Sequence, residues 1–193
     1  MGFTDEVWWS RTAQPALAAW TEGNQCLHLV EQTVAKDDPD PKALACYGMF
    51  LRTQDDPTRT HEEVWLRFVD GRPVSAITTQ YLDWCCQKLA AAGKTALLLV
   101  WDNASWHRSQ EVRAWLRAHN RQVKAHTAHV RIIPCFLPTK SPWLNPIEPK
   151  WVHTKRKVVD ADGLLPLADL ADRVCAALDC PHDAHLTIPE KVA

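Results

Sequence analysis

Five consecutive apolar residues at positions 97–101 restrict the fold of this chain more than any other segment. A strand that is apolar on both faces needs cover on both sides, as in the middle of a sheet. Packed helices supply that cover in α/β proteins. The segment therefore predicts a sheet with helices on its two faces. Asp102 follows it directly, where the chain leaves the sheet.

Further strands are predicted on both sides of this segment. In residues 2–9 the side chains of Phe3, Asp5, Val7 and Trp9 alternate and share one face. The other strand candidates are residues 26–34, 43–51, 64–69 and 130–136. Residues 36–41 and 54–60 are polar segments. Both are predicted to be loops, because their composition disfavours helices and strands.

Apolar residues at helical spacing predict four helices from residue 77 onward. The first covers residues 77–89 and stops at Gly93, and Ser109 is placed to cap the second. The third is expected to start near Pro146 and the fourth to cover residues 167–178. The order of elements predicts an α/β domain with one mixed central sheet flanked by helices.

Charge is unevenly distributed along the chain. The net charge is −1, yet residues 103–157 contain eleven Lys and Arg against two acids, Glu111 and Glu148. This segment therefore carries +9 and the remainder −10. Such asymmetry predicts one face built for a polyanion. A chance excess of basic residues on solvated helix faces is the alternative.

Composition narrows the class of protein. The 193 residues suit a globular domain with a sizeable core, and no run of apolar residues is long enough to predict a membrane span. The first residues lack the pattern of a secretory signal. Seven cysteines, an odd number without a CxxC motif, predict no disulfide framework. A reducing cytosol is the expected compartment.

Three acidic residues occupy positions at which the presence of a carboxylate calls for an explanation. Asp102 ends the apolar strand, a frequent place for functional side chains, and it suits the start of a turn with Asn103 equally well. Glu148 begins a predicted helix beside prolines, where the helix dipole alone would explain it. Asp5 lies inside a strand, where aspartate is disfavoured. Its neighbour Glu6 faces the other side and is the less favoured candidate.

Three short motifs resemble those of a known family. The apolar strand is followed by Asp-Asn-Ala-Ser-Trp-His at residues 102–107. Residues 137–148 then read Leu-Pro-Thr-Lys-Ser-Pro-Trp-Leu-Asn-Pro-Ile-Glu, with Trp151 three positions further on. A shorter, weaker match is Gly-Phe-Thr-Asp-Glu at residues 2–6. Over residues 1–158 the chain resembles insertion-sequence DDE transposases, in the bacterial branch related to mariner elements.

The resemblance implies a ribonuclease H-like fold and an active site of three carboxylates that binds two Mg²⁺ or Mn²⁺ ions. Matched residue by residue, the catalytic, metal-binding carboxylates are Asp5, Asp102 and Glu148. His107 matches the family's histidine, and a packed or hydrogen-bonded role suits it at least as well as a catalytic one. Residues 1–160 are expected to form the catalytic domain, and residues 161–193 a helical extension packed on it.

Physical chemistry gives a reason for such an arrangement. Neighbouring strands lie about 4.8 Å apart, so Asp5 and Asp102 on adjacent strands would bring two carboxylates close together. At a separation of about 4 Å they repel by roughly 4 kcal/mol at an effective dielectric near 20. Hard divalent cations relieve this repulsion. Two ions about 3.5–4 Å apart would then activate the attacking group and stabilise the departing oxygen.

Basic residues near the carboxylates are predicted to bind DNA through its phosphates rather than its bases. These residues are Arg108, Lys140, Lys150, Lys155, Arg156 and Lys157. Trp106 and Trp143 are candidates for stacking on unpaired bases, although burial is the expected fate of most tryptophans. The predicted partner is therefore DNA, both the ends of the mobile element and its target.

The chain also departs from the family pattern. Between Asp102 and Glu148 lie 45 residues, more than in many relatives, and the surplus falls around residues 119–129. Relatives usually carry a helix-turn-helix region that reads the element's ends, and none precedes Asp5. The expectation is a separate helix-turn-helix polypeptide as partner, with a homodimer as a further expected assembly. The expected location is the prokaryotic cytoplasm, near the nucleoid.

Two other functions remain open at this stage. One is a truncated, non-catalytic DNA-binding remnant of a transposase that keeps the basic face. The other is a zinc-stabilised module, although the spacing of its candidate ligands does not match structural zinc sites well. Those candidates are Cys175, Cys180, His182 and His185, with His126 and His129 as a second pair.

Overall fold

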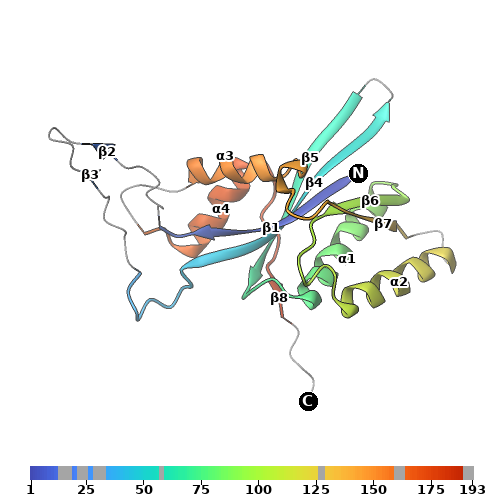
Figure 1. Ribbon diagram of the computed structural model, residues 1–193, viewed down its shortest axis with the longest axis horizontal. Coiled ribbons are helices and arrows are strands. Elements are labelled where there is room, and N and C mark those ends of the chain that lie inside the picture. Colours follow the sequence, from blue (N-terminus) through green and yellow to red (C-terminus); the bar gives the residue numbers. More distant parts are fainter. Residues whose placement is uncertain are drawn as a thin grey trace, which may run out of the picture.

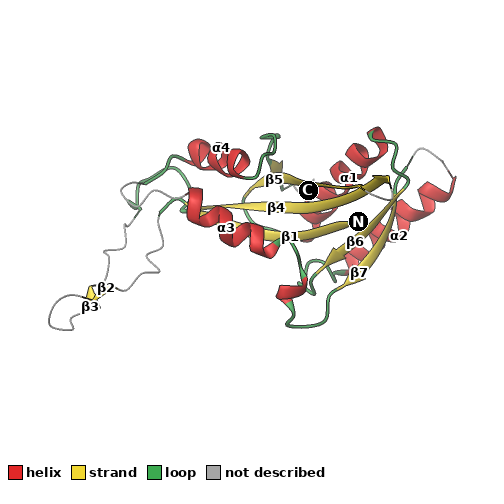
Figure 2. Ribbon diagram, turned by 90° about the horizontal axis from the view of Figure 1, so that it is seen from above, coloured by secondary structure: helices red, strands yellow, loops and turns green. Residues whose placement is uncertain are grey.

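The computed structural model of the chain describes residues 1–12, 19–20, 26–27, 34–56, 59–125, 129–158 and 164–188. A six-stranded sheet in the order β7-β6-β1-β4-β5-β8 forms its centre (Figures 1 and 2). The strands are β1 (Gly2–Ser10), β4 (Ala43–Asp56), β5 (Arg59–Asp70), β6 (Ala96–Trp101), β7 (Arg131–Phe136) and β8 (Leu186–Thr187). A separate pair is formed by β2 (Ala19–Trp20) and β3 (Cys26–Leu27).

The sheet is mixed. Strand β4 pairs antiparallel with β1 and with β5, whereas β6 is parallel to β1, β7 to β6, and β8 to β5. Helices flank this sheet, so the predicted mixed α/β class is confirmed, and the architecture is compatible with a ribonuclease H-like fold. The parallel pairing of β1 and β6 matters most for function, because it brings the first acidic motif beside the second.

Four α-helices and one short 3-10 helix are found in the described residues. They are α1 (Ser75–Ala91), α2 (Gln110–Ala125), η1 (Pro142–Leu144), α3 (Glu148–Val158) and α4 (Leu167–Ala177). The predicted cap of α2 is confirmed, because the backbone N–H of Val112 donates to Oγ of Ser109 at 3.1 Å. Gly93 follows α1 with a φ of 71°, as predicted for a helix stop. No helix in the described residues is long and apolar enough to cross a membrane.

Helices cover both faces of the sheet, as the apolar segment at 97–101 predicts. In β4, Tyr47 and Met49 face a core that includes residues of α1 and α2, while Cys46 and Phe50 face a second core with α3 and α4. Figure 1 shows α1 and α2 in green and yellow on one side of the strands, and α3 and α4 in orange on the other. Strand β6 is buried from Leu99 to Trp101.

One loop prediction is wrong and one strand prediction is only partly met. Residues 54–60 were predicted to form a loop, but β4 runs to Asp56 and β5 starts at Arg59. The ladder is made by backbone groups, so polar side chains can extend an exposed two-stranded ribbon (Figure 1). Of the predicted strand 26–34, Cys26–Leu27 is a strand, Val34 is not, and residues 28–33 lie outside the described part.

The C-terminal elements pack on the rest of the fold. Leu170 and Val174 of α4 share a core with Phe3 and Val7 of β1, and β8 pairs with β5. The division into residues 1–160 and 161–193 stays a prediction, because its boundary falls within residues 159–163, outside the described part.

Candidate active site

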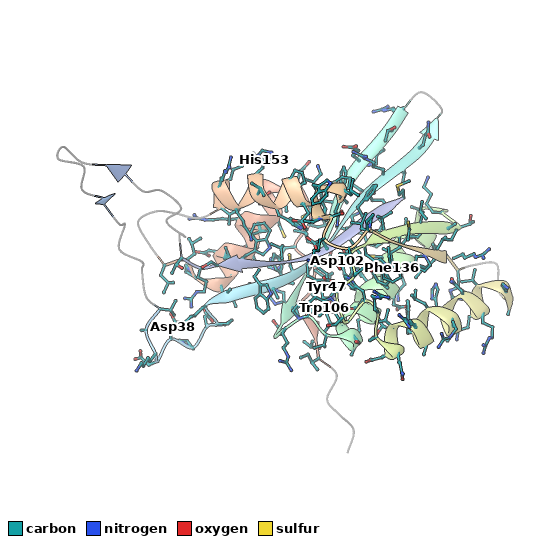
Figure 3. The ribbon with its side chains drawn as sticks, in the orientation of Figure 1. Asp38, Tyr47, Asp102, Trp106, Phe136 and His153 are labelled. Carbon is teal, nitrogen blue, oxygen red and sulfur yellow. The ribbon has the colours of Figure 1, made fainter. Side chains whose placement is uncertain are left out.

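Two of the predicted carboxylates lie on neighbouring parallel strands. Pairing of β1 with β6 aligns Gly2 with Leu99 and Phe3 with Val100, and the same offset brings Asp5 level with Asp102. Asp5 is half-buried within β1, and Asp102 follows the last residue of β6. Figure 3 labels Asp102 near the centre of the molecule. The topology thus brings together two acids that are far apart in the sequence.

Glu148, the third predicted carboxylate, is the first residue of α3 and lies in the same hollow as Asp102. Both line a cavity of about 350 Å³, together with Lys140 and Asn145 among others. Asn145 is buried, and its Nδ2 donates to the backbone oxygen of Thr4 at 3.1 Å. Because Thr4 precedes Asp5 in β1, this bond fixes the start of α3 beside the first carboxylate.

The charges of the three carboxylates influence one another. Burial and the negative charges of Glu148 and Glu6 raise the pKa of Asp5 to about 7. Burial also raises the pKa of Glu148, as does the charge of Asp102, while Lys155 opposes this shift. Such mutual repulsion is what a cation at this place would relieve.

His107 joins Asp102 to Glu6. It is 1% exposed and stacks on Trp101, and its Nδ1 lies 2.8 Å from Oδ1 of Asp102 while its Nε2 lies 2.9 Å from Oε1 of Glu6. Burial alone would lower the pKa of His107, but hydrogen bonds to both carboxylates and their charges outweigh it and raise that pKa to about 9. His107 therefore donates both N–H groups at neutral pH, and its bond holds the pKa of Asp102 below its usual value.

Asp5 is held by Trp151 of α3, which packs on the same face of the sheet. Nε1 of Trp151 donates to Oδ2 of Asp5 at 2.9 Å, and the indole is 3% exposed, edge-on to Trp9. Gly48 of β4 is opposite Asp5 in the sheet. A Cβ added at Gly48 would lie 2.3 Å from Cη2 of Trp151. Glycine is needed here to leave room for the ring that orients Asp5.

Replacing Gly48 with alanine is expected to lower the free energy of unfolding by about 1–3 kcal/mol, the usual cost of overpacking a core. The added methyl would push against Trp151, whose buried ring cannot move freely. Urea unfolding measures the change. The double variant Gly48→Ala/Trp151→Phe is the control, because the smaller ring removes the clash and should recover part of the loss. Equal stability of Gly48→Ala and the native chain would contradict this account.

The sequence motifs contain two asparagines whose positional roles were not predicted. Nδ2 of Asn103 donates to the backbone oxygen of Leu137 at 2.6 Å, which joins the loop after β6 to the loop after β7. Asn145 joins the α3 start to β1. A buried asparagine directly before Pro146 was the available signal, but its partner lies 141 positions away. Glu6, the less favoured acid, proves to be the partner of His107 and Trp106.

Most of the predicted DNA-binding residues lie on the surface. Arg108, Lys140, Lys155, Arg156 and Lys157 are exposed. Lys150 is half-buried, with its Nζ 4.2 Å from the centre of the Phe50 ring. Of the two tryptophans predicted as stacking candidates, Trp143 is 73% exposed and Trp106 is half-buried, with its Nε1 donating to Glu6. Two basic residues lie near the carboxylates: Lys140 lines the cavity, and the charge of Lys155 acts to lower the pKa of Glu148.

The three carboxylates fit a hard divalent cation in chemical type. Asp102 receives its hydrogen bonds on Oδ1, and the side chain of Glu148 accepts none from the described residues. In that part of the chain, no three or more His, Cys, Asp and Glu side chains are already gathered around one point suited to an ion. Asp5, Asp102 and Glu148 are thus not grouped as a metal site in the described part of the chain.

The candidate zinc ligands near the C-terminal end have partners of their own. Nδ1 of His182 lies 2.7 Å from Asp172, and Nδ1 of His185 lies 2.6 Å from Asp70. Both rings pack on Phe68. Sγ of Cys180 contacts the backbone oxygen of Cys175 at 3.7 Å. His126 of the second candidate pair lies outside the described residues.

Comparison with known proteins identifies a family whose model matches this chain. The family model of the DDE superfamily endonucleases matches residues 58–163, which include Asp102, Glu148 and all six predicted DNA-binding residues but not Asp5. No curated protein matches the chain. Since the matched segment covers more than half of the 193 residues, the chain belongs to the DDE superfamily endonucleases.

Proposed function

We propose that this chain is the catalytic core of a DDE transposase of the bacterial, mariner-related insertion-sequence branch. It cuts DNA strands and transfers them, with Asp5, Asp102 and Glu148 as catalytic metal ligands. The observation that carries the proposal is geometric: the register of β1 and β6 brings Asp5 level with Asp102, and Asp102 and Glu148 line one cavity. The mutual effect of these charges on their pKa values agrees with it. The family match supports the nuclease part of the proposal.

The metal requirement is proposed as two Mg²⁺ or Mn²⁺ ions held by the three carboxylates. Ions held by Asp5, Asp102 and Glu148 would supply Lewis-acid activation of an attacking water or DNA 3′-hydroxyl and charge stabilisation of the departing oxygen. The protein keeps the ligands oriented. His107 holds Asp102, Trp151 holds Asp5, and Asn145 fixes the backbone before Glu148. Such supporting hydrogen bonds set the geometry of ligands before an ion arrives.

The basic residues around the cavity are proposed to hold the phosphates of DNA from the element's ends and its target. Lys140 lines the cavity, and Lys155 is close enough to lower the pKa of Glu148. Arg108, Lys150, Arg156 and Lys157 are proposed as further phosphate contacts. Contacts of this kind position DNA without reading its sequence. A DNA substrate also underlies the predicted location, the prokaryotic cytoplasm near the nucleoid.

The test of this function is nicking of supercoiled plasmid. Purified protein is expected to convert it to the open circle in Mg²⁺ or Mn²⁺ but not in EDTA. Binding of DNA with no cleavage under either metal would instead support the non-catalytic remnant. The deciding variant is Glu148→Gln.

Replacing Asp5 with asparagine is expected to stabilise the chain by about 2–4 kcal/mol at pH 8 without divalent ions. Unfolded aspartate ionises near pH 4, whereas the pKa of Asp5 in the folded chain is about 7. The folded state thus retains a proton that the unfolded state loses. Stability falls as pH rises from about 4 to 7, and above pH 7 the whole penalty is present. Asparagine removes this penalty and still accepts from Trp151.

Urea unfolding at pH 8 and at pH 4.5 measures the effect, and the advantage of Asp5→Asn should shrink at the lower pH. Adding Mn²⁺ should raise the thermal midpoint of the native chain much more than that of the variant, because a ligand that binds only the folded state stabilises it. Equal stability of the two proteins at both pH values would contradict the assigned charge coupling.

A further inference from the structure

A second hollow of the molecule lies between α2 and the edge strand β7, outside the cavity lined by Asp102 and Glu148. Its volume is about 480 Å³. Helix α2 and β7 lie beside each other in Figures 1 and 2. We call this hollow the α2–β7 groove, and its basic lining residues are Arg113, Arg117, Arg121 and Lys124 of α2 and Arg131 of β7. The function proposed above uses none of the five.

Three of these arginines form a row. Arg113, Arg117 and Arg121 follow one another at four-residue spacing, so they share one face of α2. At about 1.5 Å per residue the row spans roughly 12 Å along the helix. One strand of DNA carries a phosphate per ~3.4 Å of duplex axis, so the row matches about three to four nucleotides.

The charge of the groove is not neutralised from within. None of the five basic side chains forms an ion pair with a carboxylate in the part of the chain that the structure describes. Surface helices commonly offset such a row with acids four residues away. On α2 the one acid is Glu111, at the opposite end from Lys124. The positive row is thus left for an external polyanion.

The row is also fixed in place. Nδ2 of Asn120 donates to the backbone oxygen of Ile132 at 2.8 Å, and the N–H of Ile132 donates back to Oδ1 of Asn120 at 2.9 Å. Nε2 of His119 lies 2.8 Å from the backbone oxygen of Val130. These bonds clamp the second half of α2 to β7. A chance excess of charge on a solvated helix needs no such clamp, whereas a preorganised surface binds at lower entropic cost.

The α2–β7 groove leads to the carboxylates. Phe136, 40% exposed, lines the groove at the end of β7, and the next residue, Leu137, lines the cavity of Asp102 and Glu148. His107 lines the groove as well and is hydrogen-bonded to Asp102. Figure 3 labels Phe136 beside Asp102, and the stacking of Phe136 on Trp101, which precedes Asp102, agrees with this placement.

We propose that the α2–β7 groove binds the phosphate backbone of the DNA strand that enters the active site, with Arg113, Arg117 and Arg121 as the main contacts. The inference rests on the proposed function, since it takes DNA as the substrate. It adds a path: DNA runs along α2, past Phe136, to the cavity that contains Asp102 and Glu148. The contacts are to phosphates, so they bind DNA of any sequence.

The test is the salt dependence of DNA binding by the full chain. Fluorescence anisotropy of a labelled duplex is measured in EDTA, where no cleavage occurs, between 50 and 200 mM salt. The triple variant Arg113→Gln/Arg117→Gln/Arg121→Gln should bind more weakly, and its log–log salt slope should fall by about 2–3, at roughly 0.9 per lost phosphate contact. The matched control neutralises three exposed basic residues elsewhere, as Lys42→Gln/Arg59→Gln/Arg72→Gln.

Folding of each variant is checked by circular dichroism, and the triple lysine variant at the same positions provides a rescue. Lysine keeps the charge, so it should restore most of the salt slope. If the groove variant and the control lost DNA affinity and salt slope equally, general positive charge would explain binding, and the proposed role of the α2–β7 groove would be wrong. An unchanged salt slope in the groove variant would also show that the proposal is wrong.

The two proposals fail in different ways. If the native chain nicks DNA but the groove variant binds as the native chain does, the groove is wrong and the function stands. If the native chain binds DNA through the groove but no metal supports nicking, the function is wrong and the groove stands. A native chain that neither binds nor nicks DNA would overturn both.

Discussion

Glutamine in place of Glu148 is expected to reduce metal-dependent nicking on the order of 10³-fold, which corresponds to about 4 kcal/mol of transition-state stabilisation. The carboxylate is proposed to hold a divalent ion, and the neutral amide holds one far less well. Losses of this scale are typical when one electrostatic group is removed from a water-poor active site. The plasmid assay measures it, with Mg²⁺ and Mn²⁺ tested separately.

The same substitution should leave the fold and DNA binding intact. Glutamine has the shape of glutamate and is a good helix former, so α3 can still begin at residue 148. The pKa of Glu148 is raised by burial and by Asp102, so loss of its charge relieves repulsion in the folded state. Glu63→Gln in β5 is the control, because it changes the same group outside the cavity. If Glu148→Gln nicked DNA at the native rate, the proposed role of Glu148 as a catalytic metal ligand would be wrong.

His107→Leu is expected to lower the free energy of unfolding by about 3–5 kcal/mol, the usual effect of breaking a buried charge pair. The side chain of Glu6 is only 7% exposed, and without His107 its charge would keep only the hydrogen bond from Trp106. Asp102 would lose its main orienting bond in the same step. Urea unfolding at pH 7 measures the loss. Glu6→Gln is the companion variant, since its neutral amide can still accept from His107.

The same contact predicts how stability depends on pH. An unfolded histidine loses its proton near pH 6.5, but in the folded chain the pKa of His107 is about 9. Its stabilising contribution is therefore complete below about pH 6.5 and is lost as pH rises through about 9. The shift corresponds to about 3 kcal/mol. Unfolding at pH 7 and pH 9.5 should show this fall in the native chain and a much flatter profile in His107→Leu. If the native chain and His107→Leu lost stability equally between pH 7 and pH 9.5, the assigned role of His107 between Asp102 and Glu6 would be wrong.

Much of the fold follows from local pattern. Alternation predicts β1, because side-chain direction along a strand repeats every two residues, and the apolar run predicts β6. The strand candidates at 43–51 and 64–69 fall within β4 and β5. The cap at Ser109 and the stop at Gly93 also come from local chemistry. The loop prediction at 54–60 was wrong. Polar composition indicates that a segment is exposed to solvent, but it does not indicate whether the backbone groups of that segment pair in a sheet.

Periodicity, turn chemistry and motif spacing are local properties, so the residues alone were enough to predict most element types and the α/β class. Which side chains meet is set by the folded molecule. Glu6 and His107 are 101 positions apart, Asp5 and Trp151 are 146 apart, and the α2–β7 groove lies between two elements that the bonds of Asn120 to Ile132 join. Such contacts depend on strand order and helix packing, and no local pattern encodes them.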